Sequence, residues 1–199
     1  MDRIPLIAGN WKMYKTGAQA VQTAQGLAGL CAGVEKVEVM IAPTFLSLSQ
    51  VWQVIKNTPV KLGAQNLYFE KQGAFTGEIS ADMIKAAGAE YVIIGHSERR
   101  QYFGETDVSV CKKIKAAIAV GLKPVLCIGE SETEREQEKT FSILDKQVSN
   151  GLKGLGFDEL KDTWKKDDTE TVKADNPETY KQKIDALEKE LETLKSEKA

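Results

Sequence analysis

The chain has 199 residues, of which 42% are hydrophobic and 28% charged, and its formal net charge is −2. This length allows one domain with a sizeable core, or a domain with an appendage. A near-neutral, slightly acidic chain gives no support to a nucleic-acid partner or to binding at an anionic membrane surface.

Three cysteines are scattered along the chain without a CxxC pair or other metal-ligand spacing: Cys31, Cys111 and Cys127. The apolar run at residues 4–8 is too short for a membrane span or for the core of a secretory signal. These features indicate reduced thiols in a cytoplasmic protein. Nothing in the sequence calls for a metal or a cofactor.

Short apolar runs alternate with segments of helical spacing over the first 160 residues. Near-continuous hydrophobicity is typical of parallel strands buried on both faces. Strands are predicted at residues 5–9, 37–42, 60–64, 91–95 and 124–129. Helices are predicted at 18–30, 46–54, 81–87 and 108–120, with a fifth running from a Ser131/Glu134 capping box toward Leu152. Gly88 and Gly121 stand where helix C-terminal glycines belong. This alternation predicts a parallel α/β sheet, either open or closed.

The composition changes after Leu160. Residues 162–176 are polar and predict a linker, and residues 177–199 carry a coiled-coil-like stripe on a charged helix. The stripe consists of Tyr180, Ile184, Leu187, Leu191 and Leu194. This helix could cover apolar surface of its own domain or pair with another chain, and the sequence leaves both arrangements open.

The first predicted strand ends in Ala8-Gly9-Asn10-Trp11-Lys12-Met13. In α/β folds the carboxyl ends of parallel strands carry the chemistry. A lysine in that place can neutralise a phosphate or a developing oxyanion. Taken alone, such a lysine is more often a solvated surface residue.

His96 is the only histidine of the chain, and it follows the fourth predicted strand. The next residues, Ser97-Glu98-Arg99-Arg100, have the character of the first turn of a short helix. Amides at a helix start disfavour an imidazolium, so a neutral ring is expected. A neutral imidazole can donate a hydrogen bond to a carbonyl and then pass on a proton. A lone histidine satisfied by backbone groups is the competing interpretation.

Read together, Gly-Asn-Trp-Lys-Met and Gly-His-Ser-Glu-Arg-Arg closely resemble the triosephosphate isomerase family, from about residue 3 to about residue 161. The resemblance implies a TIM-barrel-type parallel βα repeat, and about five of the barrel's eight βα units can be recognised in the sequence. It also implies conversion of dihydroxyacetone phosphate to glyceraldehyde 3-phosphate, a step of glycolysis and gluconeogenesis. By the same resemblance, Asn10 and Lys12 contact the substrate, and His96 and Lys12 are catalytic.

Three further residues take supporting roles from the same resemblance. Glu98 matches a glutamate close to the catalytic lysine. Cys127 and Glu130 match a segment that packs beneath the histidine region. A buried cysteine there is more often structural than nucleophilic, since the chain has no second histidine to activate it.

The segment Lys71-Gln72-Gly73-Ala74-Phe75-Thr76-Gly77-Glu78 predicts a long loop with a phenylalanine near its tip. It resembles the loop that enters the neighbouring subunit of the isomerase homodimer. The resemblance implies that Thr76 reaches toward the partner's active site and that Gln65 belongs to the same interface region. Phe75 could instead fold back on its own domain.

No segment of the sequence matches the family's general-base glutamate before Pro-Val-Trp, or its later glycine-rich phosphate-binding segment. Glu159 and Glu170 do not follow apolar strands and are poor substitutes. We therefore expect an isomerase by lineage whose activity is impaired or absent. A non-catalytic engineered or rearranged scaffold or oligomerisation module is the alternative. The expected organisation is a partial barrel at 1–161, a linker at 162–176 and a helix at 177–199.

Overall fold

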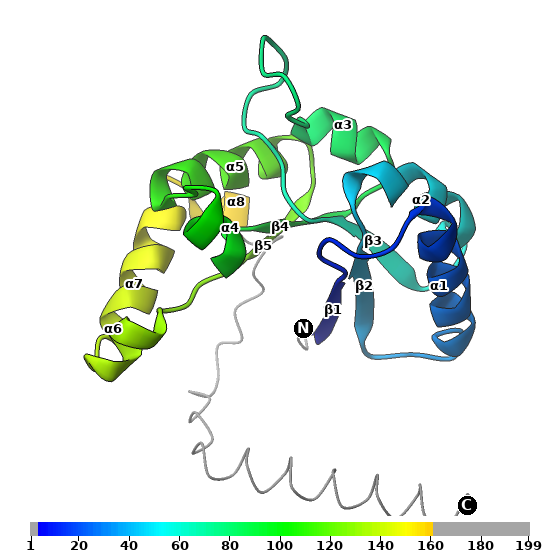
Figure 1. Ribbon diagram of the computed structural model, residues 1–199, viewed down its shortest axis with the longest axis horizontal. Helices are drawn as coiled ribbons and strands as arrows, with labels where there is room; N and C mark the ends of the chain where they lie inside the picture. The colour runs from blue at the N-terminus through cyan, green and yellow to red at the C-terminus, as the bar shows by residue number, and fades with distance from the viewer. Residues whose placement is uncertain (1–3, 161–199) are drawn as a thin grey trace, which may run out of the picture. The chain divides into compact units, whose positions relative to one another are not determined.

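The computed structural model describes residues 4–160, which belong to one compact unit. Five parallel strands pair in the order β1-β2-β3-β4-β5. The strands are β1 (Leu6–Asn10), β2 (Glu38–Ala42), β3 (Val60–Ala64), β4 (Tyr91–Ile94) and β5 (Lys123–Leu126). The sheet curls, and helices run along its outer side (Figure 1). The predicted fold class is confirmed for this part of the chain.

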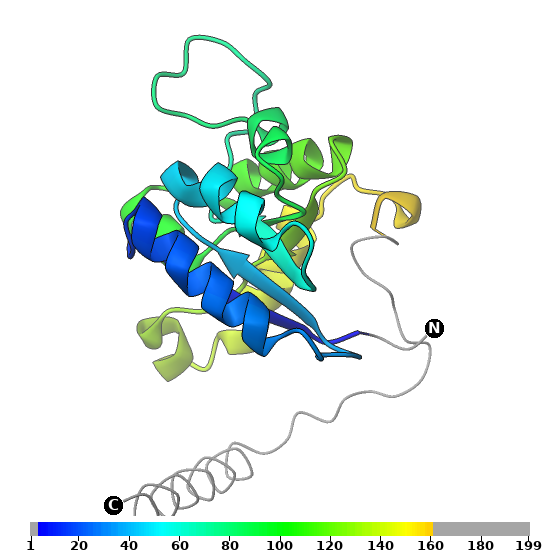
Figure 2. The same cartoon turned by 90° about the vertical axis from the view of Figure 1, so that its right-hand side faces the viewer.

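The helices lie on the outer side of the sheet, as the turned view also shows (Figure 2), and those between β1 and β5 connect successive strands. They are α1 (Gly17–Leu30), the short 3₁₀ helix η1 (Phe45–Ser47), α2 (Leu48–Ile55), α3 (Ala81–Ala86), α4 (Ser97–Tyr102), α5 (Asp107–Ala119), α6 (Glu132–Glu136), α7 (Thr140–Gly151) and α8 (Phe157–Leu160). Gly88 and Gly121 have φ angles of 95° and 72° after α3 and α5, as expected for glycines that end helices.

The single helix predicted from Ser131 toward Leu152 is wrong. The Ser131 capping box does form and opens α6, but that helix is short and a separate α7 follows. Glu138, between the two, has a φ of 57°, which takes the chain out of the helical conformation. Glutamate is a good helix former, so the sequence carries no strong signal for this break. The short α8 was also not predicted.

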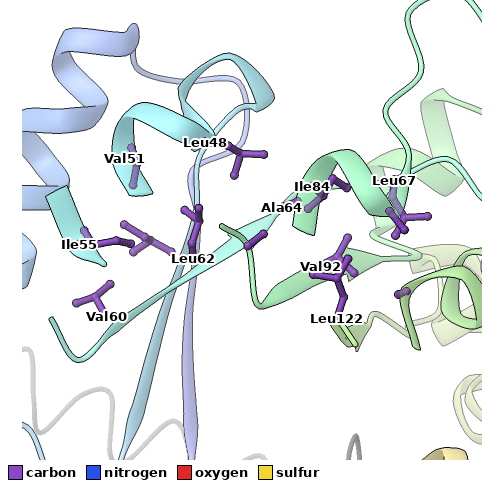
Figure 3. Packing of buried hydrophobic residues seen from close by; sticks show 14 of the residues in the cluster. Leu48, Val51, Ile55, Val60, Leu62, Ala64, Leu67, Ile84, Val92 and Leu122 are labelled. Carbon is purple, nitrogen blue, oxygen red and sulfur yellow. The ribbon is translucent and has the colours of Figure 1, made fainter. Parts of the chain in front are cut away.

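The main core lies between the sheet and its outer helices. Leu48, Val51 and Ile55 of α2 point toward Leu62 of β3, and all four side chains are almost fully buried (Figure 3). The helical spacing of the α2 residues places them on one face, which is what an amphipathic helix needs to cover a sheet. A smaller cluster on the inner face contains Met40, Ala42, Tyr91 and Ile93.

The edge strand β1 is only partly covered. Ile7 lies in register with Val39, which packs against the outer core, yet the Ile7 side chain is 61% exposed. Neighbouring residues in register point to the same side of a sheet, so Ile7 faces the outer side. Among residues 4–160 no element therefore covers this part of β1.

The linker predicted at 162–176 and the helix predicted at 177–199 lie outside the described residues. Between residues 4 and 160, no helix has both the length and the apolar character that crossing a membrane requires.

Replacing Leu62 by alanine should lower the free energy of unfolding by about 2–5 kcal/mol, because the change removes buried methyl groups and leaves a cavity. Leu30→Ala is the matched control: Leu30 is 83% exposed, so the loss should stay within about 0.5 kcal/mol. Urea unfolding followed by circular dichroism measures both. Equal losses for the two variants would contradict the core assigned here.

Candidate active site

The carboxyl ends of β1 and β4 place the predicted catalytic residues at the same edge of the sheet. Asn10 ends β1 and Lys12 follows two residues later, while His96 follows the end of β4 by two residues. Two strands separate β1 from β4 in the sheet. The Lys12 side chain crosses this gap, because its Nζ lies 2.8 Å from Oε1 of Glu98.

The backbone at Lys12 adopts a left-handed conformation, with a φ of 51°. Such a conformation costs free energy for a residue with a side chain, and it persists where neighbours fix it. The Lys12 N–H donates to Oδ1 of Asn10 at 3.0 Å. The Lys12 carbonyl accepts from Nε2 of Gln65 at 2.9 Å, and the same Nε2 donates to the Ala42 carbonyl at 2.8 Å. The side chains of Asn10 and Gln65 thus hold the backbone N–H and the backbone carbonyl of Lys12.

Glu98 stabilises the charged form of the lysine. Its hydrogen bond and its negative charge raise the pKa of Lys12 above the ordinary 10.5. The hydrogen bond from Lys12 likewise lowers the pKa of Glu98 below the ordinary 4.5. Both side chains are almost half exposed, so solvent screens the pair and its contribution to stability is small. The pair therefore serves to place the ammonium group.

The backbone N–H of Glu98 fixes the orientation of His96. It donates to Nδ1 of His96 at 3.2 Å. Oε2 of Glu98 lies farther from the same nitrogen, at 3.5 Å, so we assign the backbone as its partner. A neutral imidazole that accepts at Nδ1 carries its proton on Nε2. The ring can then donate a hydrogen bond from Nε2 to a substrate oxygen.

A buried charged network behind the histidine was not predicted. The side chains of Glu105 and Lys113 are 2% and 7% exposed, and they form a close ion pair. Oδ1 of Asn66 accepts from Nζ of Lys113 at 2.8 Å. One sequence signal was available: Lys113 interrupts the buried stripe of α5 between Val110 and Ile114.

The other two predicted supporting residues form hydrogen bonds to neither Lys12 nor His96. The Cys127 N–H donates to the Ile94 carbonyl at 2.8 Å, which continues the pairing of β4 and β5 past their ends. Burial raises the pKa of the Cys127 thiol, so it stays protonated and is a poor nucleophile. Glu130 accepts from Arg135 at 2.8 Å and from Thr140 at 3.3 Å. Its contacts thus run to α6 and to the start of α7.

The predicted interface loop projects from the body between β3 and α3 (Figure 2). Phe75 is 40% exposed, and its ring lies 4.8 Å from that of Tyr68, which in turn stacks on Phe69 at 4.4 Å. The phenylalanine therefore packs on its own loop and still presents part of its surface. Thr76 is exposed beside it, whereas Gln65 lies at the base of the loop on the Lys12 turn.

In the part of the chain that the structure describes, no group of three or more histidine, cysteine, aspartate or glutamate side chains is placed to hold a metal ion. The functional groups at the sheet edge are thus an ammonium, an imidazole and a carboxylate.

A curled parallel βα sheet with a lysine, a histidine and a glutamate at its carboxyl edge defines a TIM-barrel-type protein with an active-site arrangement. The triosephosphate isomerase family model matches residues 5–164. The chain belongs to the triosephosphate isomerase family, as its two sequence motifs indicated.

Individual relatives agree with this assignment. The chain is 54% identical over 153 residues to a triosephosphate isomerase of Endomicrobium trichonymphae, covering 77% of this chain and 61% of the relative. A relative from Geotalea uraniireducens is 48% identical over 159 residues, covering 80% and 63%. The crystal structure of triosephosphate isomerase from Bartonella henselae superposes with a TM-score of 0.74 at 37% identity, covering 77% of this chain and 64% of that one. The chain thus spans about three fifths of the length of these relatives.

Lys12→Met should return the pKa of Glu98 toward its ordinary value, because the main cause of the shift is removed. Carbon-13 NMR titration of the glutamate carboxyls measures this. Since folding lowers the pKa of Glu98, its contribution to stability is present above the ordinary pKa and is lost as the pH falls through the lowered value.

The control is Lys15→Met. Nζ of Lys15 lies over the Trp11 ring at 5.6 Å, so this change should leave the pKa of Glu98 lowered. If Lys15→Met raised it as much as Lys12→Met, a general loss of positive charge would explain the shift and the specific pair would be refuted.

Proposed function

We propose that this chain carries the substrate-polarising half of a triosephosphate isomerase site and that its own turnover is weak. The observation that carries the proposal is the joint placement of Lys12 and His96 by Glu98. One residue thereby brings a cation and a neutral hydrogen-bond donor to the same strand edge. A triose phosphate needs both, because it has a carbonyl oxygen and a charged phosphate.

The isomerisation of dihydroxyacetone phosphate moves a proton between adjacent carbons, and negative charge develops on the oxygens. In our proposal, Nε2–H of His96 donates to those oxygens. The ammonium of Lys12 balances the charge of the phosphate and of the enediolate. Oδ1 of Asn10 is occupied by the Lys12 N–H, so the Asn10 amide NH₂ is the group that contacts the substrate.

The isomerisation also needs a general base, and no segment of this sequence matches the family's general-base glutamate. Glu98 is the carboxylate nearest to His96 and Lys12, but its hydrogen bond to Lys12 lowers its pKa and makes it a poor proton acceptor. The proposal therefore assigns polarisation to this chain and leaves proton abstraction without an efficient group. The corresponding metabolic setting is glycolysis and gluconeogenesis in the cytoplasm.

The chain's isomerase activity should lie at least about 10²-fold below that of a complete family member, because a positioned base contributes on the order of 10²–10⁴-fold. The assay supplies glyceraldehyde 3-phosphate and reads dihydroxyacetone phosphate formation with a coupled dehydrogenase. Any residual activity should fall in His96→Gln and Lys12→Met and persist in the surface control Leu30→Ala. Turnover equal to that of a complete isomerase would overturn the proposed division of roles.

A non-catalytic scaffold or oligomerisation module remains the second candidate, and the two unpaired edge strands among residues 4–160 favour it. The two candidates separate on substrate binding. A scaffold would show no response of the His96 resonances to dihydroxyacetone phosphate, whereas a polarising half-site would.

We further propose that the chain associates as a homodimer through the loops that follow β1 to β4. Six exposed apolar side chains lie on these loops or on the short helices η1 and α4 within them, and exposed apolar surface is typical of contact surfaces. They are Met13, Tyr14, Leu46, Phe75, Tyr102 and Phe103.

Thr76→Arg should shift the chain toward monomer, because it places a charge beside Phe75 at the tip of the projecting loop. Sedimentation velocity measures the change, and Glu136→Arg on α6, away from these loops, is the control. A monomer before any mutation would rule out this mode of association.

A further inference from the structure

Two charged side chains hold the peptide groups of the glycine before the histidine. The Gly95 N–H donates to Oε2 of Glu105 at 3.1 Å. The Gly95 carbonyl accepts from Nε of Arg100 at 2.8 Å. Hydrogen bonds to charged groups are stronger than neutral ones, so two of them on one residue fix its orientation firmly.

Gly95 has little room to move. Its φ is 78°, and an added Cβ would lie 3.0 Å from the Cys127 carbonyl oxygen and 3.3 Å from Cγ2 of Val110. Only glycine takes this conformation in so tight a space without strain. Packing and hydrogen bonds therefore specify the same backbone geometry.

Both charged residues are anchored on α5. Glu105 pairs with Lys113, and Nη1 of Arg100 donates to Oδ1 of Asp107 at 2.7 Å. The side chains of Glu105 and Lys113 are nearly inaccessible, and those of Arg100 and Asp107 are each 18% exposed. Burying a charge is costly unless it has a partner of opposite charge. The removal of one residue from either ion pair should therefore destabilise the folded chain.

We propose that Glu105 and Arg100 are positioning residues, which hold the Gly95 peptide and thereby set the orientation of His96. With that orientation, Nδ1 of His96 meets the Glu98 N–H and the proton stays on Nε2. The inference rests on the proposed role of His96. The orientation of the ring can nevertheless be measured without substrate or turnover.

The competing explanation is that the network only stabilises the fold. Nitrogen-15 NMR of the imidazole separates the two, because it reports which ring nitrogen carries the proton. The chain has a single histidine, so the spectrum needs no assignment among histidines. A loss of stability alone would leave the tautomer of the folded population unchanged.

Glu105→Gln is the main variant. Lys113 and the Gly95 N–H donate to different oxygens of Glu105, and glutamine has an oxygen at only one of these two positions. The charged lysine should take that oxygen as its partner. The NH₂ of the glutamine then faces the Gly95 N–H, and that hydrogen bond is lost. Arg100→Lys is the second variant, since one ammonium nitrogen cannot occupy both positions from which Nε and Nη1 of Arg100 donate to Gly95 and Asp107. Both variants should lose the single Nε2–H signature and show averaged ring nitrogens.

Asn66→Ala is the matched control. It removes an acceptor from the buried Lys113 without touching Gly95, so stability should fall while the wild-type ring signature stays. An unchanged signature in folded Glu105→Gln and Arg100→Lys would overturn the proposal. If neither variant folds, Glu105→Asp takes their place, because it keeps the charge beside Lys113 but shortens the reach to Gly95. Averaged ring nitrogens in this variant would support the positioning role, and the wild-type signature would refute it.

The outcome also separates this inference from the proposed function. If the ring signature changes as expected but dihydroxyacetone phosphate leaves the wild-type His96 resonances unmoved, the positioning role stands and the proposed function fails.

Discussion

Glu98 connects the two ends of the site. Its carboxylate accepts a hydrogen bond from Lys12, which follows β1 and not the neighbouring β3 or β5. Its backbone N–H donates to the imidazole of His96. The first contact requires that β1 and β4 end at the same edge, and they do so because each neighbouring pair of strands from β1 to β4 is parallel. The second requires that α4 begin directly after His96. The arrangement of charge at the site is thus a consequence of sheet topology and of one helix start.

Behind this edge, side chains hold the backbone at Lys12 and next to His96, the two residues proposed as catalytic. Asn10 and Gln65 hold the peptide of Lys12, and Glu105 and Arg100 hold the peptide of Gly95. In both cases the supported backbone has a positive φ, which needs such support or a glycine. The reactive side chains can therefore remain partly exposed to a ligand while their backbones stay fixed.

The sequence predicted the strands and most helices within three residues at each end, because buried parallel strands and amphipathic helices leave clear periodic patterns. It also placed Lys12, His96 and Glu98 together through two family motifs. It missed the break at Glu138, since a single left-handed glutamate leaves no pattern. It also missed the pairing of Glu105 with Lys113, because charged residues are usually solvated and their burial depends on contacts between distant segments. The role of Gln65 on the Lys12 turn required the folded backbone.

We propose that His96 and Lys12 polarise a triose phosphate bound to this chain. The infrared carbonyl stretch of bound dihydroxyacetone phosphate tests it most directly, because a hydrogen bond from Nε2–H weakens the C=O bond. We predict that this stretch shifts to lower frequency at saturating protein and that the shift is lost in His96→Gln. A bound ligand whose carbonyl stretch equals that of the free compound would contradict the account.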